Sequence, residues 1–178
     1  MCLLKRNRIR TGALAVTAAP LLLLSAGAPA ATASSESAPT APVEECSGPT
    51  AAQALADGSA QLEPYLDLPP NPDLADTSGY SGCSDLSWIV VPHGNVEHAP
   101  HAVLLFHQGE YLGTATAHPL EHVPQIEQVS DDRLAIVYSY MEDGQGTPPP
   151  EGRALSTFTW NDDTQSVDHE GDFPPGVR

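Results

Sequence analysis

Residues 85–116 read DLSWIVVPHGNVEHAPHAVLLFHQGEYLGTAT and contain the pattern that decides the predicted fold. Gln108-Gly109 separates two apolar runs, and glycine suits the positive φ angle that a two-residue hairpin turn requires. The predicted hairpin has four cross-strand pairs, namely His107–Glu110, Phe106–Tyr111, Leu105–Leu112 and Leu104–Gly113. The aromatic pair fixes this register, because a slip of one residue would separate the two rings.

Both faces of the predicted hairpin are apolar. One face carries Leu104, Phe106 and Tyr111, and the other carries Val103, Leu105 and Leu112. Because apolar side chains on both faces need burial, we expect these strands to lie centrally in a sheet that is covered on each side.

The remaining elements complete a small fold. Thr50 and Gln53 have the spacing of a capping box, which predicts a helix over residues 51–56 that stops at Gly58. Alternating apolar residues predict further strands, such as 133–141, and a C-terminal hairpin. The expected fold class is α+β: a small antiparallel β-meander of about six strands with one short N-terminal helix and one disulfide.

The first 33 residues are typical of a signal peptide. A basic start precedes an apolar run over residues 12–27, and small residues allow cleavage after Ala30 or Ala33. An uncleaved membrane anchor is the alternative, but Pro20 interrupts the run. We expect residues 34–45, rich in Ser, Ala, Pro and Glu, to form a flexible tether, and residues 46–178 to form a single domain.

Cleavage would make the chain strongly acidic. The mature part keeps three arginines, no lysine and all 23 acidic residues, so its net charge is 3 − 23 = −20. Such a polyanion repels nucleic acid and anionic lipid headgroups. We therefore expect no nucleic-acid partner and no membrane insertion after cleavage. Cys46 and Cys83 are the two mature cysteines, and export predicts that they form a disulfide. Free thiols with redox or metal roles are the alternative.

Histidine is unusually dense in one region. Six of the seven histidines fall between residues 93 and 122, namely His93, His98, His101, His107, His118 and His122. Neutral imidazoles bind Zn²⁺ or Cu²⁺, and the candidate ligands are His98, His101, His118 and His122. The simpler interpretation is that these residues are polar side chains of loops and turns, with no cofactor. A role in pH sensing is a third interpretation.

Catalytic motifs are weak or missing. Residues 118–122 read HPLEH and match H-x-x-E-H, which requires both histidines on one helical face. Pro119 and Pro124 bracket a segment that is too short for such a helix, so we interpret the match as accidental. The sequence contains neither a G-x-S-x-G nucleophile motif nor a glycine-rich phosphate loop. We expect no enzyme activity and no catalytic residues.

Three stretches resemble a known family: CSGPTAAQAL at 46–55, CSDLSWIVV at 83–91 and HAVLLFHQGEYLGTAT at 101–116. Together they are similar to the LppP/LprE lipoproteins of the actinobacterial cell envelope, over residues 46 to 160. The resemblance implies an exported envelope protein of small α+β type and carries over no catalytic residue. In this chain Ala28, rather than the acylated cysteine, follows Ser25-Ala26-Gly27. We therefore expect a secreted or cell wall-associated protein without a lipid.

These observations predict a non-enzymatic module that binds an envelope protein or a small ligand. An extracytoplasmic metal-binding protein that uses the histidines of residues 93–122 is the alternative. A hydrolase comes third, since it would need a Ser or Glu in a cleft beside one of those histidines.

Overall fold

Seven strands and two short helical segments make up the described residues, 47–96, 98–146 and 149–177, of the computed structural model. All of them fall within one unit, Val43–Arg178. The elements in chain order are α1 (Ala51–Ser59), the 3₁₀ helix η1 (Pro72–Leu74), β1 (Ser87–Pro92), β2 (His101–His107), β3 (Glu110–Thr114), β4 (Gln125–Ser130), β5 (Arg133–Tyr140), β6 (Gly152–Asn161) and β7 (Ser166–Gly171).

The strands form two antiparallel sheets, in the orders β1-β2-β3 and β4-β5-β6-β7. The predicted antiparallel strands and short N-terminal helix are confirmed, but the prediction of one meander of about six strands is wrong, because seven strands form two sheets. The chain leaves the first sheet in the segment after β3, which contains Pro119 and Pro124 and cannot continue a regular ladder. The second sheet then turns back and covers one apolar face of the first.

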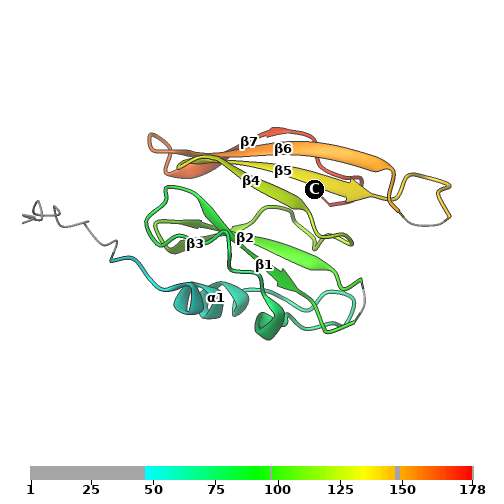
Figure 1. Ribbon diagram of the computed structural model, residues 1–178, viewed down its shortest axis with the longest axis horizontal. Helices are drawn as coiled ribbons and strands as arrows, with labels where there is room; N and C mark the ends of the chain where they lie inside the picture. The colour runs from blue at the N-terminus through cyan, green and yellow to red at the C-terminus, as the bar shows by residue number, and fades with distance from the viewer. Residues whose placement is uncertain (1–46, 97, 147–148, 178) are drawn as a thin grey trace, which may run out of the picture. The chain divides into compact units, whose positions relative to one another are not determined.

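The first sheet lies between α1 and the second sheet (Figure 1). On the side of α1, Ile89, Val91, Leu104 and Phe106 pack with Ala54 of the helix. On the opposite side, Val103 and Leu105 pack in one core with residues of the second sheet, including Ile136, Phe158 and Trp160. The expectation that both hairpin strands are central and covered on each side is confirmed for β2 and wrong for β3, which is an edge strand of its sheet.

The hairpin register is confirmed near the turn and wrong beyond it. His107 pairs with Glu110 and Phe106 with Tyr111, but Leu105 pairs with Gly113 and Leu104 with Thr114. Leu112 is the extra residue of a β-bulge between these pairs. Gly113 has a φ of 136°, which glycine adopts without strain, and Leu112 is left 36% exposed.

The capping box at α1 is confirmed. The Thr50 side chain accepts a hydrogen bond from the Gln53 backbone N–H, and the Gln53 side chain accepts one from the Thr50 backbone N–H. The helix runs to Ser59 and so passes the predicted stop at Gly58. A Cβ at Gly58 would lie 3.1 Å from Leu104 and 3.2 Å from Phe106, so glycine lets the helix approach the sheet closely.

Several predictions fall on residues 1–46, outside the described part of the chain. They are the signal peptide over residues 1–33, the tether over residues 34–45 and the position of Cys46. The disulfide between Cys46 and Cys83 stays a prediction, because Cys46 lies outside the described residues. Among the described residues, no helix is long and apolar enough to cross a membrane.

Candidate functional site

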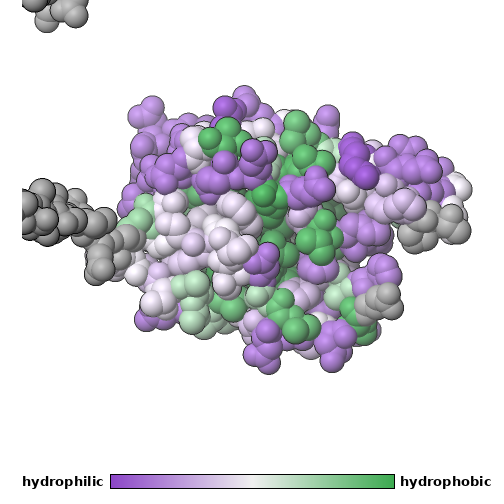
Figure 2. Space-filling model, viewed as in Figure 1, coloured by the Kyte–Doolittle hydropathy of each residue, from purple (hydrophilic) through white to green (hydrophobic). Residues whose placement is uncertain are grey.

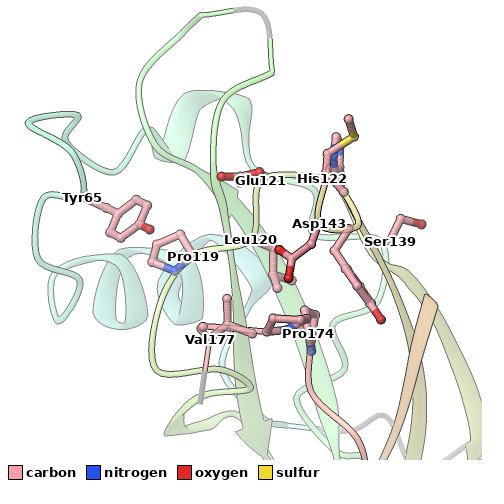
Figure 3. Close-up of a pocket in the computed structure, with 13 residues that line it drawn as sticks. Tyr65, Pro119, Leu120, Glu121, His122, Ser139, Asp143, Pro174 and Val177 are labelled. Carbon is pink, nitrogen blue, oxygen red and sulfur yellow. The ribbon is translucent and has the colours of Figure 1, made fainter. Parts of the chain in front are cut away.

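A hollow with a volume of about 380 Å³ lies among the described residues (Figure 3). We call it the Asp143 hollow. Its walls come from the segment after β3, the end of β5, the loop after β5 and the residues after β7; the lining residues used below are Leu120, Glu121, His122, Asp143, Pro174 and Val177.

Backbone hydrogen bonds hold the walls of the Asp143 hollow in place. Leu120 and His101 exchange two N–H to carbonyl bonds of 2.7 Å, which fix the segment after β3 against β2. The Ala117 N–H donates to the Val177 carbonyl at 3.2 Å and ties down the C-terminal segment. Backbone hydrogen bonds therefore fix the walls of the hollow, although most of its lining residues lie outside strands.

Acidic and apolar groups share this hollow. Leu120, Pro174 and Val177 supply apolar surface, and the Asp143 carboxylate is turned toward Leu120 and Pro174, whereas the Ser139 hydroxyl points away from them (Figure 3). Neither lysine nor arginine is among its described lining residues. The arrangement suits a small molecule with an apolar body and a cationic or hydroxyl head.

A second hollow of about 280 Å³ adjoins the first and shares Tyr65 and Pro119 with it. We call it the His93 hollow. His93 is fully buried, and its Nδ1 lies 3.2 Å from the Leu68 carbonyl oxygen. A carbonyl only accepts, so Nδ1 carries the hydrogen and Nε2 of the neutral ring is an acceptor. Nε2 has no hydrogen-bond partner among the described residues.

The four predicted metal ligands lie in different places. His98 and His101 line one shallow hollow, His118 lines the His93 hollow, and His122 lines the Asp143 hollow. His118 is exposed and stacks on Tyr65, with ring centroids 6.1 Å apart. Within the described ranges, no group of three or more His, Cys, Asp or Glu side chains is placed to hold a metal ion. Zinc or copper binding stays a prediction.

Burial is the main cause that lowers the pKa of His101 below its ordinary value, and repulsion from the protonated form of nearby His93 is the lesser cause. Residues 118–122 contain no helix, so the H-x-x-E-H match lacks the helical face on which that chemistry depends.

The simpler interpretation made His107 a polar side chain beside the hairpin turn. Its ring instead stacks on the ring of Trp160, with centroids 3.8 Å apart, and so connects the two sheets.

Sequence reasoning missed a serine–histidine contact. His169 Nε2 lies 2.8 Å from the Ser156 hydroxyl, which in turn donates to the Asp172 carbonyl at 2.9 Å. The two residues are on the neighbouring strands β6 and β7, and only the register of those strands would have revealed the contact. Ser156 is fully buried, so its hydroxyl is out of reach of a substrate and serves the packing of this sheet.

The comparisons with known proteins agree with one part of the sequence analysis. Residues 78–163 match the LppP/LprE lipoprotein family, which indicates an envelope-associated, extracytoplasmic protein. The match spans β1 to β6 and begins after α1, so it is shorter than the resemblance expected from residue 46. No curated protein and no solved structure was found to be similar to the chain.

Proposed function

We propose that this chain, which matches the LppP/LprE lipoprotein family over residues 78–163, is a non-enzymatic binding module of the cell envelope. In this proposal the protein is secreted or wall-associated and holds a small molecule in the Asp143 hollow. The observation that carries the proposal is the combination, in one framed hollow, of an inward-turned carboxylate and an apolar wall.

The dimensions of the hollow support a small ligand. Small-molecule sites commonly occupy about 300–1,000 Å³ and combine apolar walls with a few polar groups, and the Asp143 hollow is at the lower end of that range. On the face shown in Figure 2, hydrophobic residues form small patches among hydrophilic ones. The proposal therefore rests on the framed hollow and not on an apolar surface of this face.

Electrostatics narrows the ligand class. The chain has a formal net charge of −16, and Glu121 joins Asp143 in lining the hollow. An anionic ligand would be repelled, so the proposal is for a neutral or cationic molecule. A cation about 4 Å from the Asp143 carboxylate would gain about 1 kcal/mol in water-like surroundings, or about fivefold in affinity.

The test uses the mature protein and two probes that share a benzyl group, benzyltrimethylammonium and benzyl alcohol; the quaternary cation carries a charge but no N–H. Ligand-observed NMR titration should give saturable binding of both and an approximately fivefold preference for the cation. Asp143→Asn should remove the preference and leave benzyl alcohol binding unchanged. Asp163→Asn is the matched control, because Asp163 is an exposed aspartate beyond the other end of β6. If neither probe saturates, or if both variants lose the preference equally, the proposal is wrong.

A further inference from the structure

We infer that the His93 hollow is a second ligand site, and that it takes the primary ammonium group of a small organic cation. This inference does not depend on the Asp143 hollow, although the two hollows share Tyr65 as a wall. It depends on which of the polar atoms around His93 have hydrogens left to donate.

The main observation behind this inference is the unpartnered Nε2 atom of His93. The ring is fully buried, its Nδ1 hydrogen is used by the Leu68 carbonyl, and Nε2 has no partner among the described residues. A buried acceptor without a donor loses the hydrogen bond that water supplies in the unfolded chain. A ligand that brings an N–H to Nε2 would restore that bond.

The two threonines of this hollow are acceptors as well. The Thr114 hydroxyl donates to the Thr116 carbonyl at 2.8 Å, and the Thr116 hydroxyl donates to the His118 carbonyl at 2.7 Å. Each hydroxyl has therefore used its one hydrogen and keeps lone pairs. The Glu63 carboxylate also lines the hollow and only accepts when ionised. Four side chains that line this hollow can therefore accept a hydrogen bond from a ligand.

The aromatic wall favours a cation over a neutral donor. Tyr65 meets His93 edge-on, with ring centroids 6.3 Å apart, and Tyr111 lines the same hollow. Aromatic faces attract cations, and no lysine or arginine is among the described lining residues. A primary ammonium supplies three N–H donors and a positive charge, whereas a quaternary ammonium supplies only the charge.

Entry to the site requires a movable wall, because His93 Nε2 is shielded from solvent. Tyr65 is half-buried and its ring contacts both His93 and the exposed His118. The turn after it places Leu66 and Asp67 at φ angles of 52° and 63°, a conformation that costs side-chain-bearing residues energy. Tyr65 is therefore the side chain that we expect to move when a ligand enters.

The experiment follows the imidazole nitrogens of the mature protein, labelled with ¹⁵N in histidine, during titration with n-butylammonium chloride. His93→Phe assigns the His93 signals by their loss. The expected result is a saturable shift of the His93 Nε2 resonance, with much weaker shifts from choline, which has no N–H, and from glucose, which has no charge. Equal responses to choline, a stronger response to glucose, or no shift of Nε2 would each overturn the inference.

Two threonine variants test the site without replacing the buried His93. Thr116→Val removes one acceptor and should weaken n-butylammonium binding about tenfold, the loss expected for one hydrogen bond to a charged donor. Thr159→Val is the matched control, since Thr159 lies on β6, away from the described lining of this hollow, and should bind as the wild type does. Asp143→Asn should leave the His93 response intact, which separates this inference from the proposed function. Equal weakening by both threonine variants would contradict the assignment.

Discussion

Replacing Phe106 by alanine is expected to lower the free energy of unfolding by about 3–5 kcal/mol. The ring is fully buried between β2 and α1. It meets Tyr80 edge-on, with centroids 5.4 Å apart, and Tyr111 at 5.7 Å. Each aromatic pair adds about 0.5–1.5 kcal/mol to the cost of the cavity, so the loss should reach the upper part of the range. A Cβ at Gly58 would already lie 3.2 Å from this ring, so the helix is packed directly on it.

Urea unfolding of the mature protein, followed by tryptophan fluorescence and far-UV circular dichroism, measures this loss. The control is Leu155→Ala, which also truncates a large apolar side chain, but one that is 55% exposed on β6. We expect the control to cost less than about 1 kcal/mol. If Phe106→Ala cost no more than Leu155→Ala, the helix would not be packed on the first sheet as described, and the layered core would be wrong.

Three further changes test single features of the fold. Burial raises the pKa of Tyr138 from 10.0 to about 12, so the unfolded chain releases this proton first as the pH rises. On the order of 2–3 kcal/mol of the free energy of unfolding should therefore be lost between pH 10 and pH 12. Tyr138→Phe should reduce this loss when melting temperatures are measured across that pH range. The pKa of His101 is lowered from 6.5, so the unfolded chain binds the proton more readily; stability should fall as the pH drops below 6.5, and His101→Gln should reduce that slope. Gly109 has a φ of 86°, and a Cβ there would lie 2.4 Å from Pro49, so Gly109→Ala should cost more than about 1 kcal/mol in chemical denaturation, whereas Gly144→Ala, with a φ of 84° and nothing within 4 Å, should cost only the conformational part.

The hairpin was predictable because its turn depends on two adjacent residues. Gln108 and Gly109 adopt φ angles of 46° and 86°, as the sequence pattern indicated. The bulge at Leu112 was not predictable, since alternation of apolar residues does not show where one extra residue enters a ladder. The two-sheet arrangement was also hidden, because a period of two is the same in a meander and in a sandwich.

The hollows were harder to predict than the strands. Tyr65 and Val177 lie in segments without periodicity, and only the folded chain brings them to the same wall. The density of histidines drew attention to residues 93–122 as a metal site, but the sequence could not show that the backbone directs His93 and His118 to one hollow and His122 to another. Burial of His93 follows from its position directly after β1, next to the turn that carries Tyr65.

The most direct test of the binding function is a map of backbone amide shifts in the uniformly ¹⁵N-labelled mature protein as benzyltrimethylammonium is added. The account predicts saturable shifts concentrated at the walls of the Asp143 hollow, at Leu120, His122, Asp143 and Val177. Shifts spread over the exposed strands of the second sheet, or no saturable shift at these four residues, would contradict it.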